Sequence, residues 1–378
     1  MPRSPLLYLV TSALLLPAAC NTQEPTPGAP VAAAVEDLAP AIDRALTWLV
    51  AHQDEDGRFD VDDFMKHDRE GTKCDGAGNA VHDLGATGLA MLAMLGNGTT
   101  MRAGPYKKQL TLAVDWMRKQ QQENGRFGTA TSHDFIYDHA IATFAMCEAY
   151  GLSKYEALKQ YAQRGLNYLE AHRNPYAVWR YQPRDNDNDT SVTTWALLAL
   201  TSGKSFGLEV NEASLKLVAT WYDQVTDENG RAGYSKAGEP SSRLVGDHAT
   251  KFPPERGEAM TAAALAGRFF LGQTPQQTPS MTLSAARLSK KPPEWKSDRI
   301  DAYYWYMGTL AMWQMGGESW ASWQPGLAQI AGAQRQDANF AGSWDPIGVW
   351  DVEGGRVYAT ALYVMTLQIA HRYTRLMR

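Results

Sequence analysis

The sequence has few cysteines and no excess of basic residues. Only three of its 378 residues are Cys, at positions 20, 74 and 147, which is too few for a disulfide scaffold and lacks the paired spacing of a structural zinc site. The 36 Lys and Arg stand against 41 Asp and Glu, so the formal net charge is −5. No run of Lys and Arg occurs, which argues against nucleic acid as a partner. We therefore expect no nucleic-acid partner, no metal and no other cofactor.

Apolar residues are too few for a polytopic membrane protein and too many for a disordered chain. The composition is 44% hydrophobic and 20% charged, with 32 Gly and 19 Pro. These proportions exclude disorder and collagen, and they allow a large buried core. The length alone would allow more than one domain, so internal repeats decide how the chain is organised.

The N-terminus has the pattern of a secretion signal. Arg3 precedes an apolar run over residues 6–16, which ends in small residues and Cys20. The run is too short to remain as a membrane-spanning helix. Cys20 at the expected cleavage point resembles a bacterial lipobox, although Pro17 stands where Leu is usual. An ordinary signal peptide followed by an incidental Cys is the alternative.

This pattern sets the expected domains and location. We expect a signal peptide over 1–19, a lipidated Cys20 that begins a Pro-rich tether over 20–36, and a single folded domain over 37–378. The protein would then be a membrane-anchored lipoprotein of the cell envelope, facing the periplasm or the exterior.

One pattern recurs along the remaining chain. Trp48, Gln53 and the run Gly57-Arg58-Phe59 are repeated at the same spacing by Trp116, Gln121 and Gly125-Arg126-Phe127. Weaker copies contain Trp221 with Gly230, Tyr168 with Trp179, and Gln334 with Trp344. Each copy leads into a more apolar helix of small and aliphatic residues. These helices are expected over 84–95, 139–150, 190–200, 259–269, 303–315 and 358–369.

Each repeat pairs an amphipathic helix with a helix that is apolar nearly all round. The apolar helix must be buried, whereas the amphipathic helix can face water. Such pairs stack on their neighbours, and six of them can close into a ring without an exposed end. We therefore predict an all-α, closed (α/α)6 toroid that is monomeric. The outer helix of the fifth pair, near 281–288, should be short because prolines surround it.

The repeat also carries a family resemblance. The string Arg-Ala-x-x-Trp-Leu-x-x-x-Gln-x-x-x-Gly-x-Phe over residues 44–59 resembles the QW repeat of squalene-hopene and oxidosqualene cyclases. The chain is similar to the terpenoid cyclase and protein prenyltransferase superfamily, and most similar to an uncharacterised bacterial group of prenyltransferase and squalene oxidase repeat proteins. The resemblance implies inner and outer helix rings around a central cavity. It also implies a small-molecule or lipid-like ligand.

Polar and aromatic residues stand where the inner helices should begin. If these helices run parallel, their first turns meet at one mouth of the cavity, where clustered carboxylates can raise one another's pKa. An acid near a helix N-terminus can instead be a cap for free backbone amides. The starts of the inner helices also carry His82, Tyr137, Tyr303 and Arg356. The residues assigned to the ligand site at this mouth are Asp83, Asp138, His139, Asp189, Trp195, Glu258, Asp301, Tyr304, Trp305 and Tyr358.

The stretch over 180–191 resembles the Asp-x-Asp-Asp-Thr motif with which class II terpene cyclases protonate their substrate. In either register Asn188 fills one acid position, so the motif is incomplete. If the cavity is catalytic, Asp189 is the expected acid, with Asp187 perturbing its pKa, and His139 is the expected base. The alternative is a polar turn that leads to an Asp cap.

The sequence gives little support for a metal. The superfamily's prenyltransferase branch holds zinc with Asp-x-Cys and a His, but the similar stretches here read Asp301-Ala302-Tyr303 and Tyr358-Ala359-Thr360, so that site is absent. The first loop holds residues of metal-binding types whose spacing matches no known framework. These residues are His67, Cys74, Asp75, His82 and Asp83. A disulfide between Cys74 and Cys147 stays open.

Two long loops interrupt the repeats. The loop over 60–82 is expected to cover the cavity mouth. The loop over 234–254 contains Ser, His and Asp, yet no Gly-x-Ser-x-Gly turn announces a nucleophile, so we interpret it as a lid or ligand-contact loop.

Three functions remain open from the sequence. The first is an envelope lipoprotein that binds an apolar or aromatic-stacking ligand in its cavity without chemistry. The second is a terpene cyclase-like or prenyltransferase-like enzyme, an isomerase or lyase that uses the rim carboxylates as acid and base. Against it stands the secretion signal, because such enzymes draw on intracellular precursors. The third is a glycan-active (α/α)6 enzyme, since aromatic rings also stack on sugars.

Overall fold

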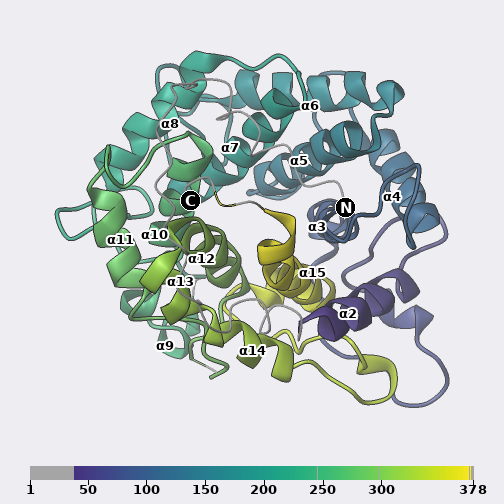
Figure 1. Cartoon of the computed structure of the whole chain (residues 1–378). Coiled ribbons are helices and arrows are strands. Elements are labelled where there is room, and N and C mark those ends of the chain that lie inside the picture. The colour runs from purple at the N-terminus through teal and green to yellow at the C-terminus, as the bar shows by residue number, and fades with distance from the viewer. Residues whose placement is uncertain (1–37, 245, 297, 374, 376–378) are drawn as a thin grey trace, which may run out of the picture.

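Six buried helices lie side by side around the centre of the molecule (Figure 1). The computed structural model describes residues 38–244, 246–296, 298–373 and 375. Each inner helix packs against the next along the chain, and the last packs back on the first. This contact confirms the predicted closed ring. The inner helices are α3 (Asp83–Gly96), α5 (Ile136–Ser153), α7 (Thr190–Ser205), α10 (Ala259–Phe270), α12 (Ala302–Met315) and α15 (Asp351–Arg372).

A second set of helices surrounds this ring (Figure 1). They are amphipathic, and α4, for example, buries Leu110, Ala113, Val114 and Met117 on one face. The predicted short outer helix of the fifth pair is α11, with 9 residues. The sixth outer element is divided in two at Pro325. The outer helices are α2 (Ala39–Ala51), α4 (Lys107–Gln120), α6 (Lys159–His172), α8 (Glu212–Val225), α11 (Ser280–Leu288), α13 (Gly317–Trp323) and α14 (Pro325–Gly332).

The connections between these helices contain only short helical turns. They are η2 (Phe64–His67), η3 (Ala80–His82), η4 (Glu156–Leu158), α9 (His248–Lys251), η5 (Pro254–Arg256) and η6 (Ala338–Phe340). Within the described ranges the chain forms isolated β-bridges but no strand, so the fold is the predicted all-α toroid. None of the helices described has the length and apolar character needed to span a bilayer.

The repeated glutamine and glycine join neighbouring pairs. The side-chain amide of Gln53 donates to the carbonyl of Gly57 in its own turn at 3.0 Å and to that of Gln109 at the next outer helix at 2.9 Å. Gly57 has φ +103°, and a Cβ there would lie 2.2 Å from the Leu112 carbonyl oxygen. The repeat residues therefore fix each turn against the backbone of the following outer helix.

The residues with expected processing roles fall outside this description. The signal peptide over 1–19, Cys20 and the tether over 20–36 all precede the first described residue.

Cys74 and Cys147 are both buried and both free, so the disulfide left open by the sequence is not formed.

Candidate functional site

A cavity of about 260 Å³ lies at one end of the inner ring. Every inner helix lines it with residues from its first two turns, so all six helices begin at the same end. This arrangement agrees with the parallel direction expected from the sequence. The helix residues that line the cavity are Gly85, Ala86, Leu89, Tyr137, Asp138, Ile141, Ser191, Trp195, Ala259, Met260, Tyr303, Glu353, Gly354 and Tyr358.

Aromatic rings make up much of the cavity wall. Trp195 stacks on Tyr306 with ring centroids 6.0 Å apart and planes inclined by 14°. The same indole lies 6.0 Å from the ring of Tyr303. Tyr137 and Tyr181 face one another with centroids 6.1 Å apart. A wall of this kind suits a ligand with an apolar or aromatic body.

His82 and Asp138 form an ion pair in the cavity. The His82 Nδ1 lies 3.1 Å from an Asp138 carboxylate oxygen, and its Nε2 lies 3.7 Å from Glu353. Burial opposes the charged imidazole, but the hydrogen bond and charge of Asp138 outweigh it and raise the pKa of His82 to about 9. A Cβ at Gly85 would lie 2.3 Å from Asp138 Oδ1, so this glycine makes room for the carboxylate.

The connection between α8 and α10 also lines the cavity. Ser241, Ser242, Arg243 and Leu244 all face the cavity, as the expectation of a ligand-contact loop over 234–254 requires. The Arg243 guanidinium donates from Nε to the Phe252 carbonyl and from Nη1 to the Ser242 carbonyl, both at 2.7 Å. Burial lowers the pKa of Arg243.

A buried polar chain runs from Asp189 to the cavity. Asp189 caps α7 by accepting the Val192 amide at 2.7 Å, and its other oxygen accepts the Tyr234 hydroxyl at 3.2 Å. The Tyr234 hydroxyl also lies 2.5 Å from that of Tyr181, and both of these rings line the cavity. Burial raises the pKa of Asp189 to about 7. Its carboxyl therefore exchanges a proton near neutral pH behind two cavity tyrosines.

Of the residues assigned to the ligand site, Asp138, Trp195 and Tyr358 line the cavity. His82, Tyr137 and Tyr303, expected at the same helix starts, line it as well. The other residues assigned to the site lie outside its lining. They are Asp83, His139, Asp187, Asp189, Glu258, Asp301, Tyr304 and Trp305.

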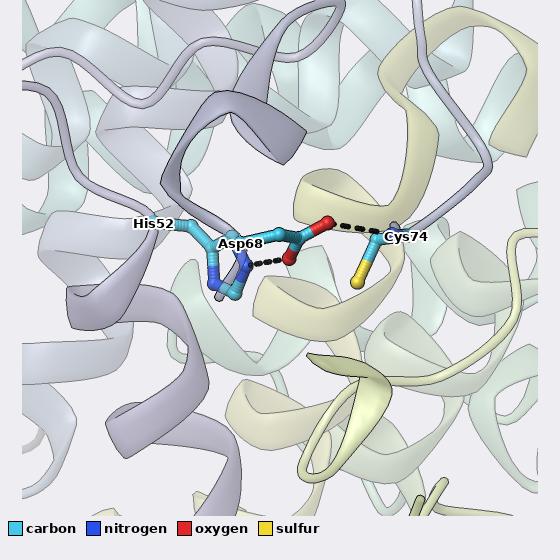
Figure 2. Close-up of side chains that lie close together, drawn as sticks. All are labelled: His52, Asp68 and Cys74. Atoms are coloured by element: carbon cyan, nitrogen blue, oxygen red, sulfur yellow. Dashed lines mark hydrogen bonds and ion pairs between the residues drawn. The ribbon is translucent and has the colours of Figure 1, made fainter. Parts of the chain in front are cut away.

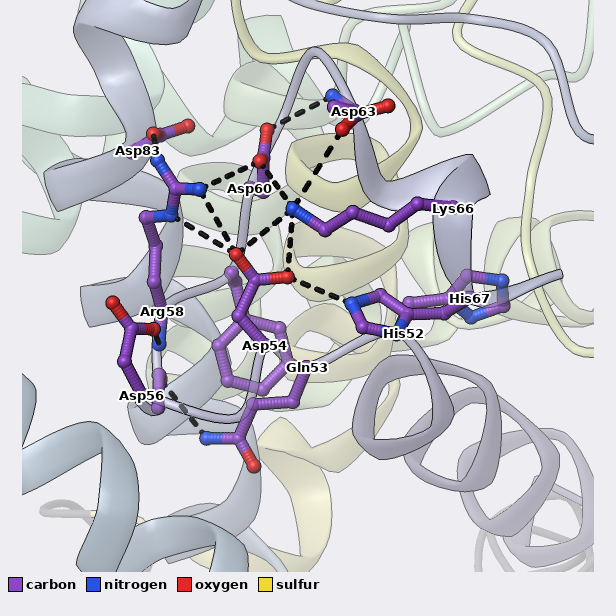
Figure 3. A network of polar contacts seen from close by, with 12 residues as sticks. His52, Gln53, Asp54, Asp56, Arg58, Asp60, Asp63, Lys66, His67 and Asp83 are labelled. Carbon is purple, nitrogen blue, oxygen red and sulfur yellow. Dashed lines mark hydrogen bonds and ion pairs between the residues drawn. The ribbon is translucent and has the colours of Figure 1, made fainter.

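Three of these acids form hydrogen bonds or ion pairs with backbone amides and cationic side chains outside the cavity. Asp83 accepts the Val61 amide at 2.9 Å and Arg58 Nη1 at 3.0 Å, and Figure 3 shows Arg58 shared among Asp54, Asp60 and Asp83. Asp301 caps α12 through the Tyr304 amide at 2.9 Å. Glu258 is surrounded by cations, with Arg287 at 3.1 Å and Lys291 at 3.0 Å.

His139 has a structural role that recurs in the repeat. Its Nδ1 accepts the Phe127 amide at 3.0 Å, and its Nε2 donates to the Gly165 carbonyl at 3.2 Å. Threonine hydroxyls accept the corresponding amide in other pairs, as Thr87 does for Phe59 and Thr193 for Trp179. Burial lowers the pKa of His139 to about 3, so the ring stays neutral.

The remaining expected residues point away from the cavity. Asp187 is exposed and lies 3.6 Å from Arg180. The raised pKa of Asp189 thus comes from burial and not from Asp187. Tyr304 donates its hydroxyl to the Lys291 carbonyl at 2.7 Å, and Trp305 packs against Trp295 with centroids 5.9 Å apart.

Other residues of the cavity wall were not individually expected from the sequence. Arg243, Tyr181 and Tyr234 come from irregular connections, where no periodic signal marks them. Glu353 belongs to the start of α15, which begins earlier than the apolar pattern indicated. In the loop over 60–82, His82 alone lines the cavity.

The metal-type residues of the first loop are separated by the fold. His67 contacts Asp54 at 2.7 Å, Asp75 pairs with Arg356, and His82 pairs with Asp138. The grouping considered from the sequence is therefore not assembled.

Comparison with known proteins identifies the fold. No protein family and no characterised protein matches the chain by sequence. An unsaturated glucuronyl hydrolase from Bacillus sp. GL1 matches with a TM-score of 0.60 and 13% identity, over 88% of this chain and 96% of its own. A variant of the type II terpene cyclase MstE from Scytonema matches at 0.54 and 15%, over 91% and 100%. An alpha-amylase from Clostridium perfringens matches at 0.57 and 11%, over 88% and 97%. The likeness establishes the fold alone, and the chain is an (α/α)6 toroid similar in fold to these three proteins.

Proposed function

We propose that the protein binds a small ligand in the central cavity, and that this ligand joins an apolar or aromatic body to an anionic group. The observation that carries the proposal is Arg243. This cation lines an aromatic cavity, yet its hydrogen bonds go to backbone carbonyls, and no carboxylate among the described residues lies within 4.0 Å of it. A cation in such a place is best balanced by an anionic group of the ligand.

The other charges of the cavity fit this assignment. Asp138 is already paired with His82 on the side of α3 and α5, so it does not compete for Arg243. All six inner helices begin at the cavity, and each N-terminus contributes a partial positive charge there. Asp134 and Glu353 also line the cavity, where their charges act on His82. Asp301 and Glu255 lie farther than 4.0 Å from Arg243 and offset part of its charge. The guanidinium and the helix N-termini together favour an anion near the connection that carries Arg243.

The apolar part of the ligand would lie against the rings of Trp195, Tyr303 and Tyr358. The terpene cyclase MstE has been solved with geranylgeranyl dihydroxybenzoate, which joins an apolar chain to an aromatic carboxylate. That ligand combines the same two kinds of group, in a protein with the same fold. It supports the proposed ligand class without defining the compound.

The test uses two dyes that differ by one sulfonate group. Anilinonaphthalene sulfonate carries an anionic group that N-phenyl-1-naphthylamine lacks. We expect Arg243→Gln to weaken binding of the sulfonate roughly tenfold, the effect of one charge-assisted hydrogen bond, and to leave the neutral dye unchanged. Trp195→Leu should weaken both dyes. Arg69→Gln, at an exposed position outside the cavity, is the matched control. Equal effects of Arg243→Gln on both dyes would contradict the proposal.

Acid–base catalysis is a second candidate, favoured by the carboxylates around His82. The imidazole lies between Asp138 and Glu353, and Asp189 reaches the cavity through Tyr234. Such a set could serve either cyclisation or hydrolysis of a glycosidic bond. Product formation from geranylgeranyl dihydroxybenzoate and from unsaturated glucuronyl disaccharides can be followed by mass spectrometry. Turnover that Asp138→Asn abolishes would establish catalysis, and absence of product with retained binding would support a binding protein.

The location is a further part of the proposal. The secretion pattern and Cys20 favour a lipoprotein anchored in the cell envelope. Cys20→Ser should then release the protein from membranes and abolish the incorporation of labelled palmitate. Unchanged membrane fractionation and an unacylated wild-type protein would contradict it.

A further inference from the structure

Three side chains with metal-binding atoms meet at the end of α2. They are His52, Asp68 and Cys74, whose donor atoms all lie within 4.8 Å of one another (Figure 2). All three residues are buried, and none of them lines the central cavity. The cluster is therefore separate from the proposed ligand site.

The hydrogen bonds of His52 fix which ring nitrogen carries the proton. Nδ1 lies 2.8 Å from the Trp48 carbonyl oxygen, which can only accept, so Nδ1 must donate. In the neutral ring Nε2 then has a lone pair, and it faces Asp68 Oδ1 at 3.0 Å. Two buried electron-rich atoms at this distance repel unless a positive charge lies between them. The pair therefore holds either a proton, on His52 or on Asp68, or a metal cation.

The geometry points to a Zn²⁺ ion held by His52 Nε2, an Asp68 carboxylate oxygen and Cys74 Sγ. Nitrogen, oxygen and sulfur together are the donor set that zinc accepts in proteins. A ligating histidine normally donates its other ring N–H to a carbonyl or carboxylate, as His52 does to Trp48. Asp68 is oriented in turn, because its second oxygen accepts the Cys74 amide at 2.6 Å.

The described residues provide three ligands, so a water molecule completes the tetrahedron. On binding, the Cys74 thiol loses its proton to solvent as the Zn–S bond forms. If His52 was doubly protonated beforehand, it releases a second proton. Zinc uptake at this site is therefore accompanied by proton release.

The position of the cluster indicates what the ion would do. The cluster joins the end of α2, at His52, to the connection that carries Asp68 and Cys74 and leads to the cavity. Beyond Cys74 this connection pairs with α15, through Asp75 with Arg356 and through the Asn79 amide with the Glu353 carbonyl at 2.7 Å. It then ends at His82 in the cavity wall. The ion thus stabilises the segment that presents His82, and it does not depend on the identity of the cavity ligand.

The test measures metal binding directly on the full chain. We expect the purified protein, stripped with a chelator and then dialysed against ZnCl₂, to retain one Zn²⁺ per chain. Cys74→Ser should lower the zinc affinity at least tenfold, and Cys147→Ser, at a buried thiol outside the cluster, should not. Cobalt substitution of the wild type should produce a thiolate-to-cobalt absorption band. The cobalt absorption is measured on the wild-type protein. The proposal can therefore be tested even if Cys74→Ser fails to fold.

Each alternative outcome overturns the site. A wild-type protein that binds neither Zn²⁺ nor Co²⁺ would leave His52 and Asp68 as a pair that holds a proton. Zinc retained equally by the wild type and a folded Cys74→Ser variant would exclude Cys74 as a ligand. Asp68→Asn gives an independent check, because it keeps the shape of the side chain but removes the charged ligand.

Discussion

The side-chain amide of Gln334 donates a 2.8 Å hydrogen bond to the carbonyl of Ala41, which joins the end of the ring to its beginning. The same amide donates to the Gly342 carbonyl in its own turn at 2.9 Å. Gln121 makes the equivalent pair of bonds, to Gly125 at 3.1 Å and to Tyr161 at 2.9 Å. The closing junction therefore has the construction of an internal one, with α2 in the place of the next outer helix.

Removal of this amide should destabilise the toroid. Gln334→Ala leaves two buried carbonyls without their donor, and we expect the free energy of unfolding to fall by about 1–3 kcal/mol. Gln53→Ala should cost a similar amount. Urea denaturation followed by circular dichroism measures both. The exposed Gln276→Ala is the control, with an expected change within about 0.5 kcal/mol. Equal effects of Gln334→Ala and Gln276→Ala would argue against a closing role.

Gly342 should tolerate no side chain, whereas Gly332 should. Gly342 has φ +103°, and a Cβ there would lie 2.4 Å from the Arg44 carbonyl oxygen. Gly332 lies in α14 with no atom near the position of a Cβ. We expect Gly342→Ala to lower the thermal midpoint clearly, and Gly332→Ala to raise stability by about 0.5–1 kcal/mol through helix propensity. Loss of stability in both variants would contradict this distinction.

The fold could be predicted from the sequence because the same helix-pair pattern occurs several times along the chain. The apolar stretch over 190–200, for example, lies within α7 (Thr190–Ser205), since a helix that is apolar all round has to be buried. The division of the sixth outer element at Pro325 was not foreseen. A single proline within one copy does not reveal whether the helix kinks or breaks.

The site was harder to predict from the sequence, because residue type does not reveal which way a side chain points. Asp301 and Asp138 both stand at the start of inner helices. Asp301 turns back to cap its own helix, whereas Asp138 lies on the face directed to the cavity. The lining residues Asp138 and Ile141 are three positions apart, as on one helix face. Arg243 and the cluster of His52, Asp68 and Cys74 come together only through irregular connections, which have no period.

His139 should be replaceable by threonine. Because threonine accepts the corresponding amide in other pairs, His139→Thr keeps an acceptor for Phe127, whereas His139→Leu leaves that amide buried and unpaired. We expect the Leu variant to be less stable than the Thr variant by about 1–3 kcal/mol. Binding of anilinonaphthalene sulfonate should be unchanged in the Thr variant. Loss of ligand binding or turnover in a stable Thr variant would instead support a role for His139 at the site.

The ion pair of His82 and Asp138 predicts a stability that falls at alkaline pH. The pKa of His82 rises from 6.5 to about 9 on folding, so the folded state holds a proton that the unfolded state loses between these values. The contribution is therefore complete below pH 6.5 and disappears as the pH rises through about 9. The free-energy difference between the wild type and His82→Gln should shrink over this range, by up to about 3 kcal/mol. A difference that stays constant across the range would contradict the assignment.

Asp189 predicts a pH dependence in a more acidic window. Burial raises its pKa from 3.8 to about 7, so between these values the folded state keeps a proton that the unfolded state has lost. The contribution of Asp189 to stability therefore falls as the pH rises through this window, because ionisation of Asp189 is unfavourable only in the folded state. Asp189→Asn resembles the protonated side chain, since its amide oxygen can still accept the Val192 amide. Near the acidic end of the window the two proteins should be equally stable, and above pH 7 the variant should be more stable by up to about 4 kcal/mol. Urea denaturation across the window measures this difference. If the wild type instead gains stability over the variant as the pH rises, Arg180, 3.9 Å away, stabilises the carboxylate more than burial disfavours it, and Asp189 cannot be the neutral-pH acid of the cavity.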